Sequence, residues 1–570
     1  MHMLTRLVVF VALTAVALAA HAQPKYYHNA NIYTLDPEQP RAEVMLVEDG
    51  LITAIGSKAA VREAMRTQGV RVIDKVDMYG LTIIPGLIDA HGHMIGLGSL
   101  GLGMLDLRSA DSYDEVINII RDQASHLPAG TWIVGRGWDN EAWTDTRLPH
   151  HAKLSKAVPD HPVWITRVDG HAGLANAHAM ELAGVTPQTP SPDGGEVLRD
   201  PQDEAVGLFI DNAKWLIGRV LPAGLTGTIE EAILQAQEMC LAAGLTGVHD
   251  AGVSPAEIEV YQKLEAEGKL KIRVYAMVHS ETAPAYFENH GTTDSFKLSV
   301  YAAKAYADGA MGSRGASLLE PYDDRPTDSE GEPYTGLALT DPEAIEQLAT
   351  HALEHNYQLC THAIGDRANR ETLDAYARAL EGWTPPPLRE GETEPLGHRL
   401  RIEHAQLVHP DDIARFAELG VIPSMQPTHC TSDMRWVEDR VGPKRAKGAY
   451  AWASLLKSGA RPAFGSDFPV ESHNPFLGIA AAITRQNADG EPAGGWHAEQ
   501  RLTREETLRA FTIDAAYAAF WEERVGTLEA GKLADFIVLD RDIMTCDPRD
   551  IADTKVLQTI SYGEVVYEAK

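Results

Sequence analysis

Two histidines two residues apart, His91 and His93, follow an apolar run and constrain this sequence more than any other feature. Residues 83–94 read IIPGLIDAHGHM: a strand-like run, a Pro-Gly turn and then Asp-Ala-His-Gly-His. Side chains alternate along a strand, so residues two apart point to the same side. Two imidazoles on one side of a strand end can hold one metal ion. They can also be two ordinary histidines after a turn, and the choice depends on whether other strand ends supply further ligands.

Length and charge narrow the class of protein. With 570 residues, 44% of them hydrophobic, the chain is long enough for one large catalytic domain with elaborations. The formal net charge of −31 repels phosphate backbones and anionic lipids, so we expect no nucleic-acid partner. The four cysteines lie far apart and form no disulfide framework or Cys-x-x-Cys site, so we expect free thiols.

Residues 1–22 are predicted to be a secretory signal peptide. Arg6 precedes the apolar residues 7–20, and Ala20-His21-Ala22 fits a small-x-small cleavage site. The apolar run is too short to span a bilayer comfortably, and no later uncharged stretch approaches that length. We expect cleavage after Ala22, a periplasmic or secreted mature chain, and no stable membrane insertion. An uncleaved anchor is the alternative.

The two ends of the mature chain look alike, because both contain short strand-like runs joined by turns. One example is the hairpin signal Glu48-Asp49-Gly50 between apolar runs. Neither end alone has enough strands for a stable sandwich. We therefore predict one small composite β-sandwich domain built from residues 23–82 and 511–570, with residues 83–510 inserted between them.

The inserted part alternates apolar strand-like runs with helical patterns, as βα units of a parallel sheet do. A capping box of Thr228 and Glu231, for example, begins one predicted helix. The alternation predicts an α/β fold, a (β/α)₈ TIM-like barrel, whose catalytic groups lie at the C-terminal ends of the strands. Residues 97–160 and 181–227 fit the alternation less well and are interpreted as insertions that cover the barrel mouth.

Side chains suited to metal binding or acid–base chemistry close several predicted strands. In chain order they are His91 and His93 after residues 83–88, His171 after 163–166, Lys304 after 300–303, His362 after 358–361, His404 after 400–402 and Asp467 after 463–465. Each alone can be an ordinary turn residue, but together in one barrel-like series they indicate a site. Imidazole and carboxylate suit zinc and similar divalent ions. Two such ions about 3.5–4 Å apart can activate water and polarise a carbonyl, and a lysine carbamylated by CO₂ can bridge them.

These motifs resemble those of the amidohydrolase superfamily, and more narrowly its amidohydrolase-3 subgroup of YtcJ-like and N-substituted formamide deformylase-like proteins. The matching stretches span nearly the whole mature chain: PGLIDAHGHM, GRGWDNEAW, DGHAGLANAHAM, GLTGVHDAG, KAYADGAMGSR, THAIGDRA, RIEHAQLV, PSMQPTHCTSDM, FGSDFPVES and GTLEAGKLADFIVLD. The resemblance implies the barrel with its composite β domain. It also implies metal-ligand roles for His91, His93, Lys304, His362, His404 and Asp467. Relatives more often have a threonine at the place of Gly315.

The function implied is a secreted metal-dependent amidohydrolase that cleaves a C–N bond, an amide or an N-acyl or N-formyl group, of a small molecule. We expect one or two divalent ions, zinc first, with manganese or cobalt as alternatives. Asp467 is the expected proton acceptor and donor, and His171 the expected stabiliser of the oxyanion. Two other functions stay open: a metal-dependent esterase or lactonase at the same site, and a non-catalytic binding protein on this fold. A homodimer is also open.

Five further residues in the matching motifs are candidate substrate contacts with an equally ordinary structural alternative. Arg136 and Arg314 can hold a substrate carboxylate or form structural salt bridges. Trp138 can form a pocket wall or pack in a core. His249 and His429 can bind substrate or satisfy hydrogen bonds in the core.

Overall fold

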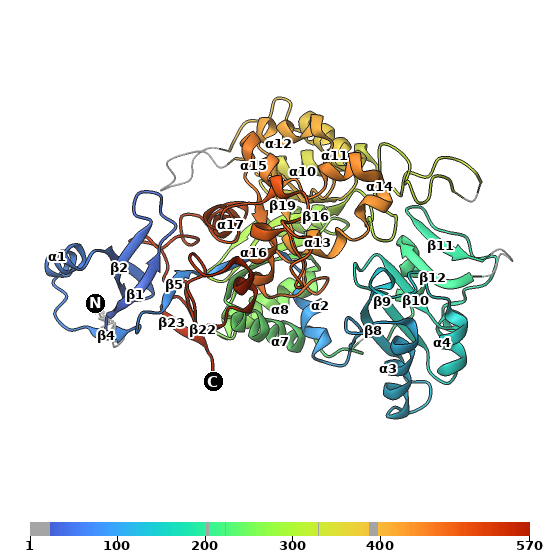
Figure 1. Cartoon of the computed structure of the whole chain (residues 1–570), viewed down its shortest axis with the longest axis horizontal. Coiled ribbons are helices and arrows are strands. Elements are labelled where there is room, and N and C mark those ends of the chain that lie inside the picture. The colour runs from blue at the N-terminus through green and yellow to red at the C-terminus, as the bar shows by residue number, and fades with distance from the viewer. Residues whose placement is uncertain (1–22, 201–204, 223, 329, 387–396) are drawn as a thin grey trace, which may run out of the picture.

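The computed structural model describes residues 23–200, 205–222, 224–328, 330–386 and 397–570, so the predicted signal peptide lies outside the described residues. The described strands form three sheets. In Figure 1 the sheet of the chain ends lies at the left, the barrel in the middle and an inserted domain at the right. None of the helices in these ranges combines the length and the apolar character needed to cross a bilayer.

Strands from both chain ends share one sheet, which confirms the predicted composite domain as part of the fold. Its order is β23-β22-β21-β5-β1-β2-β3, with β4 beside β1. The strands are β1 (Lys25–Tyr33), β2 (Arg41–Glu48), β3 (Leu51–Gly56), β4 (Asp74–Asp77), β5 (Thr82–Pro85), β21 (Phe536–Leu539), β22 (Val556–Ser561) and β23 (Glu564–Glu568), and α1 (Lys58–Gln68) follows β3. The predicted hairpin turn joins β2 to β3, with Asp49 and Gly50 both at positive φ, as its tight geometry requires.

Eight parallel strands form the barrel, in the order β6, β13, β14, β16, β17, β18, β19 and β20, which confirms the predicted TIM-like fold. They are β6 (Leu87–Gly92), β13 (Leu245–Val253), β14 (Arg273–His279), β16 (Leu298–Tyr306), β17 (Gln358–Ala363), β18 (Arg401–His404), β19 (Ile422–Met425) and β20 (Ala463–Phe464); β15 (Thr293–Asp294) pairs with β16 at its edge. A bridge between Gly92 and Phe468 joins the first strand to the segment after the last.

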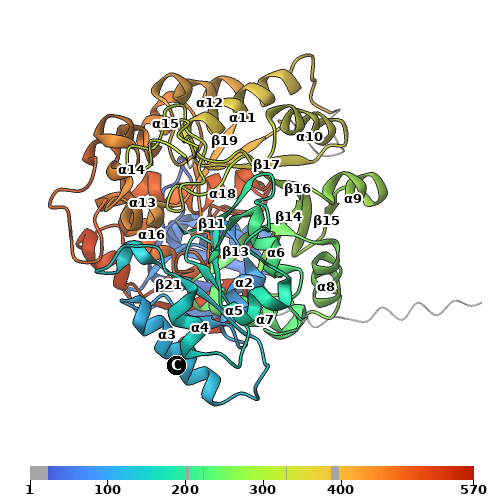
Figure 2. The same cartoon turned by 90° about the vertical axis from the view of Figure 1, so that its right-hand side faces the viewer.

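Helices surround the barrel strands, as Figure 2 shows. They are α7 (Ile229–Ala242), α8 (Pro255–Ala266), α9 (Ala283–His290), α10 (Pro342–Glu354), α11 (Asp366–Ala379), α12 (Ile413–Leu419), α15 (Trp452–Ser458), α16 (Pro475–Thr484), α17 (Arg504–Ala510) and α18 (Ile513–Ala518). Further helices lie in the connections: α2 (Met94–Leu100), α6 (Trp215–Gly218), α13 (Pro427–Asp433) and α14 (Val437–Arg445). The predicted capping box of Thr228 and Glu231 begins α7 with both of its hydrogen bonds.

The interpretation of residues 83–88 as one strand is wrong, because the chain divides at Pro85-Gly86. β5 pairs with β21 in the terminal sheet, and β6 then begins the barrel. Residue 86 must be glycine at this crossing, since a Cβ there would lie 2.2 Å from the Thr246 hydroxyl oxygen. The terminal sheet is therefore connected directly to the strand that carries His91.

The interpretation of residues 163–166 as a barrel strand is also wrong. They belong to β9, which pairs with β8 and β10 in a separate six-stranded sheet of order β11-β12-β10-β9-β8-β7. This inserted domain comprises β7 (Leu105–Asp106), α3 (Tyr113–Ser125), β8 (Ile133–Trp138), α4 (His151–Ala157), β9 (Val163–Arg167), β10 (Ala172–Ala175), α5 (Ala177–Ala183), β11 (Gly195–Arg199) and β12 (Ala205–Asp211). It has its own apolar core, so β9 finds partners close in sequence. The third barrel strand is instead β14, in RVYAMVH.

A buried ion pair joins the barrel to the terminal sheet. Arg273 begins β14, and its Nη2 lies 3.1 Å from Oδ2 of Asp535, with both side chains 2% exposed. Asp535 Oδ1 accepts a hydrogen bond from the Tyr562 backbone, 2.6 Å away. The carboxylate thus balances a cation that burial would otherwise leave alone.

We predict that Asp535→Ala lowers the free energy of unfolding by about 3–5 kcal/mol, because Arg273 stays buried without its partner. Urea unfolding followed by circular dichroism measures the change. The double variant Arg273→Met/Asp535→Leu removes both charges and should regain most of the loss. Equal destabilisation of the single and double variants would show that the buried charge is not the cause.

Candidate metal centre

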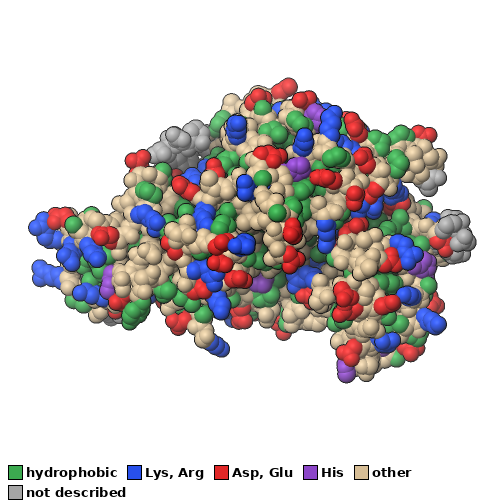
Figure 3. Space-filling model, in the orientation of Figure 1, with side chains coloured by type: hydrophobic (Ala, Val, Ile, Leu, Met, Phe, Trp, Pro, Cys, Tyr) green, Lys and Arg blue, Asp and Glu red, His purple; other side chains and the backbone are tan. Residues whose placement is uncertain are grey.

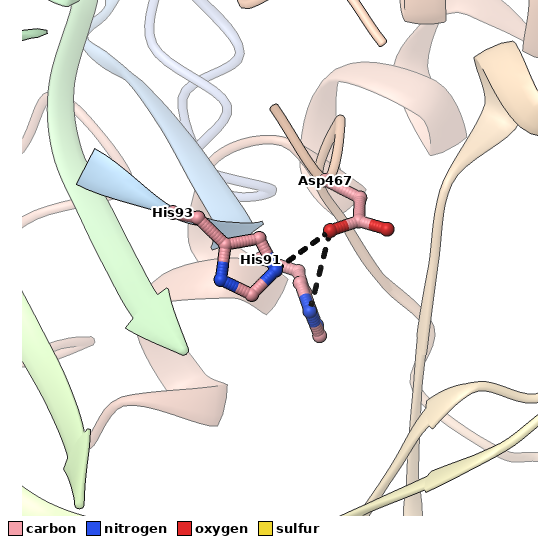
Figure 4. A group of neighbouring side chains, drawn as sticks. All are labelled: His91, His93 and Asp467. Atoms are coloured by element: carbon pink, nitrogen blue, oxygen red, sulfur yellow. Dashed lines mark ion pairs between the residues drawn. The ribbon is translucent and has the colours of Figure 1, made fainter. Parts of the chain in front are cut away.

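β6 carries His91 and His93 to the C-terminal end of the barrel, where both face Asp467. Their Nε2 atoms lie 3.7 and 3.0 Å from Asp467 Oδ1 (Figure 4). The other ring nitrogens are already bonded: His91 Nδ1 lies 2.5 Å from Glu403 Oε2, and His93 Nδ1 donates to the Ala251 carbonyl over 2.9 Å. Such bonds fix the ring orientation and leave each Nε2 available to a metal ion.

His362 at the end of β17 and His404 at the end of β18 complete a group of four imidazoles. The rings of His362 and His404 lie with their centroids 4.4 Å apart. His404 Nδ1 lies 2.9 Å from Gln426 Oε1, which leaves its Nε2 free. His362 Nε2 instead lies 3.4 Å from the Gly309 carbonyl, which leaves its Nδ1 free. The four rings thus offer three Nε2 atoms and one Nδ1.

Lys304 and Asp467 lie in the same group. Lys304 is in β16, and its Nζ is 3.1 Å from His91 Nε2. Asp467 follows β20, and its backbone N–H donates to the His91 carbonyl over 2.7 Å. The structure therefore brings all six residues predicted as metal ligands to one end of the barrel.

Burial and contacts within the group together keep these side chains in the forms that bind a cation. Burial lowers the pKa of His91 to about 4 and the pKa values of His362 and His404 well below their usual range. Burial alone would raise the pKa of Asp467, but contact with His93 and His91 outweighs it and holds that pKa well below its usual range. Neutral imidazole and ionised carboxylate are the ligand forms of divalent zinc.

A second group of ligands shares Asp467 with the first. Donor atoms of His91, His93 and Asp467 all lie within 4.8 Å of one another, and so do those of His404, His429 and Asp467. His429 Nε2 lies 3.8 Å from Asp467 Oδ2 and is buried without a hydrogen-bond partner among the described residues. A cation would satisfy this nitrogen, so the donor set fits a metal ion. From the sequence, His429 could bind substrate or satisfy hydrogen bonds in the core. The available signal was its place in α13, directly after β19.

His171 reaches this centre from the inserted domain, between β9 and β10. Its ring centroid lies 5.1 Å from that of His362, and its Nδ1 lies 2.5 Å from Asp211 Oδ1. Asp211 ends β12 at a φ of 47°, and sequence reasoning missed it. A Cβ at Gly315 would lie 2.4 Å from Asp211 Oδ2, so the threonine of relatives would not fit beside this carboxylate.

Three other sequence candidates are held by the protein itself. Arg314 makes two hydrogen bonds to Asp324, of 3.2 and 2.8 Å, which is the salt-bridge alternative. Trp138 is fully buried, and its Nε1 donates to the Ile165 carbonyl over 3.2 Å, which is the core-packing alternative. His249 is also fully buried, in the barrel interior.

Two cavities, of about 600 and 560 Å³, meet at the centre. Both are lined by His171, His362, His404 and Asp467, and the larger one also by Arg136. Figure 3 shows the surface hollowed between the barrel and the inserted domain. A small molecule can therefore extend to both sides of the candidate metal ligands.

Comparisons with known proteins agree with this architecture. The amidohydrolase family model matches residues 74–567. The chain is 32% identical to the YtcJ protein of Bacillus subtilis (strain 168), over 95% of this chain and 99% of that protein. It is 27% identical to N-substituted formamide deformylase of Arthrobacter pascens, over 95% of this chain and 97% of that enzyme. An uncharacterized metal-dependent hydrolase from Pyrococcus horikoshii OT3 has a similar structure, with a TM-score of 0.71 and 28% identity over 92% of this chain and 99% of that one.

We predict that purified protein contains roughly one to two divalent ions per chain, held by this donor set. Elemental analysis should show a lower metal content in His93→Ala, because an Nε2 ligand is lost, and in His429→Ala, because the second group is broken. His126→Ala, at a side chain 70% exposed, is the control and should leave the content unchanged. If His93→Ala kept the wild-type metal content, the first group would not be a metal site. If His429→Ala kept it, the second group would not be one.

Proposed function

The chain belongs to the amidohydrolase family, and from this membership we propose that it hydrolyses a C–N bond, in an amide or an N-acyl or N-formyl group, of a small molecule. One observation carries the proposal: neutral imidazoles and an ionised carboxylate converge where two cavities meet. The likeness to N-substituted formamide deformylase supports the choice of a C–N bond.

The expected cofactor is one or two divalent ions, zinc first and manganese or cobalt as alternatives. His91, His93, His404 and Asp467 would hold them, with His362 and His429 completing the set. When bound, such an ion acts as a Lewis acid and lowers the pKa of water.

Asp467 is the residue that would move the proton. Its carboxylate is ionised at neutral pH, because contacts with the surrounding histidines keep its pKa low. It can therefore accept a proton from the attacking water and pass it to the leaving nitrogen. Both cavities are lined by Asp467, so both the water and the leaving group can reach it.

His171 would stabilise the negative charge that develops on the substrate oxygen. Asp211 accepts from His171 Nδ1, which fixes the orientation of the ring. When the imidazole carries a second proton on Nε2, that nitrogen would present a hydrogen-bond donor to the cavity, as an oxyanion requires. Asp211 thus acts through His171 as a positioning residue.

Lys304 would be carbamylated. Burial lowers the pKa of its amine, which increases the neutral fraction, and only the neutral amine attacks CO₂. The amine nitrogen bonds to the carbon of CO₂ and releases one proton to water, so the product is an anionic carbamate with two oxygens beside His91 Nε2. A crystal structure of the metal-loaded protein tests this: density for an unmodified amine would refute the carbamate.

The proposal is tested with matched amides and esters of the same acyl groups. We expect hydrolysis of amides, loss of activity on chelation, and recovery with Zn²⁺, Mn²⁺ or Co²⁺. Turnover of esters or lactones alone would identify an esterase on the same site. Full activity in metal-free protein would contradict the mechanism, and a metal-loaded protein without any hydrolytic activity would favour a binding function.

For Asp467→Asn we predict a fall in kcat of about 10²–10⁴-fold, the usual contribution of a positioned acid–base group. The amide keeps the shape and one oxygen ligand, so part of the metal should remain. Turnover and metal content are measured on the same preparation. Near-wild-type kcat would remove Asp467 from the mechanism, and the metal content shows whether a loss of activity is a loss of the ligand.

We also propose that the protein is exported and cleaved after Ala22. The support is Arg6, the apolar residues 7–20 and the small-residue site that follows them. N-terminal sequencing of protein recovered from its natural compartment should begin at Gln23. Recovery of a chain that begins at Met1 would contradict this.

A further inference from the structure

Two cationic side chains line the larger cavity beside the metal ligands. Arg136 comes from β8, and Lys214 from the turn that follows β12, so both belong to or adjoin the inserted domain. The same cavity is lined by His91, Lys304 and Asp467. Carboxylates line this cavity as well, those of Asp169, Asp211 and Glu281 besides Asp467.

Both cations are anchored on one short segment by backbone carbonyls. Nη2 of Arg136 donates to the Val168 carbonyl over 3.1 Å, and Nζ of Lys214 donates to the Gly170 carbonyl. A Cβ at Gly170, whose φ is 74°, would lie 3.1 and 3.3 Å from Nη2 and Nη1 of Arg136. The absence of a side chain at Gly170 therefore leaves room for the guanidinium of Arg136.

Among the described residues, no carboxylate oxygen lies within 4.0 Å of the charged nitrogens of either cation, so neither forms an ion pair. Nε of Arg136 is also buried without a hydrogen-bond partner among these residues. The nearby carboxylates are engaged elsewhere: Asp169 with Arg167, over 2.5 Å, and Asp211 with His171. Carboxylates act on both cations from a distance, but two like charges partly removed from water without a direct ion pair are costly. An anion that enters the cavity would relieve this cost.

The smaller cavity differs, because each arginine that lines it is already paired. Arg108 lies 2.5 Å from Asp106, Arg167 lies 2.8 Å from Asp139, and Arg435 also contacts Asp139. Its remaining walls include the carboxylates of Asp433 and Glu471. An anionic group is therefore favoured on only one side of the metal ligands.

We propose that Arg136 and Lys214 form a subsite for a carboxylate of the substrate, so that the preferred substrate is an amide with a carboxylate on one side of the scissile bond. The scissile carbonyl would then lie at the metal ligands, and the uncharged substituent would extend into the smaller cavity. This rests on the hydrolase function proposed above. A guanidinium and an ammonium can bind one carboxylate together through charge-assisted hydrogen bonds.

The test uses pairs of N-acyl amines that share one scissile amide and differ only by a terminal carboxylate or methyl group, placed on the acyl or the amine side. We expect the wild type to favour the carboxylate member of one series by about 10- to 100-fold in kcat/KM. Arg136→Met and Lys214→Met should each reduce this ratio by about tenfold, since each removes one charge-assisted bond. Lys153→Met is the control, because Lys153 lies on α4 of the same domain, is 65% exposed and lines a different cavity.

The outcomes separate the subsite from the reaction. Hydrolysis of both members of every pair at equal kcat/KM would overturn the subsite and leave the hydrolase function standing. If no member is hydrolysed, the hydrolase proposal fails, and calorimetry with glutarate on the metal-loaded protein still decides the subsite. Binding that weakens in Arg136→Met and Lys214→Met but not in Lys153→Met supports it; equal binding in all four proteins overturns it. Circular dichroism and metal content of each variant exclude unfolding as the cause.

Discussion

Closure of the barrel is the constraint on which the metal centre depends, because the first and last strands supply the ligands that face each other. The backbone N–H of Asp467 donates to the His91 carbonyl over 2.7 Å, and that of His93 donates to the Phe468 carbonyl over 2.8 Å. The hydrogen bonds that join the ends of the barrel therefore also fix the carboxylate against both imidazoles. Gly92 between the histidines is required by the same approach, since a Cβ there would lie 2.5 Å from the Phe468 ring. The His-Gly-His pattern thus combines two candidate ligands with the contact that closes the fold.

A buried ion pair between Arg401 and Glu403 lies behind the candidate ligands and helps to fix His91. Glu403 precedes the ligand His404 in β18; its Oε1 lies 2.7 Å from Nε of Arg401 and its Oε2 lies 2.5 Å from Nδ1 of His91. Burial alone would raise the pKa of Glu403, but Arg401 and His91 outweigh it and keep the carboxylate ionised. One strand therefore supplies a candidate ligand, His404, and, from the residue before it, the group that orients the candidate ligand His91 of β6.

The residues at strand ends were predictable because their signal is local. A polar residue directly after an apolar run needs only the run itself to be recognised, and His91, His93, Lys304, His362, His404 and Asp467 all have such a signal. Pairing between strands is not local. The run at residues 163–166 looks like any barrel strand, and only its pairing with β8 and β10 places it in another sheet. Asp211 ends the last strand of this domain and Lys214 follows it, so their position beside the barrel had no sequence signal.

The chain divides its chemistry between two structural units. The barrel supplies the candidate metal ligands, whereas the inserted domain and the turn after it supply His171, Arg136 and Lys214, the groups that would contact substrate. Two arginines of the barrel loop around α14 contact the inserted domain. Arg440 lies 2.5 Å from Glu141, and Arg435 contacts Asp139. These contacts fix the inserted domain over the barrel mouth. Changes in the inserted domain can therefore alter which substrate binds while barrel closure keeps the ligand geometry intact, which separates the determinants of specificity from those of metal binding.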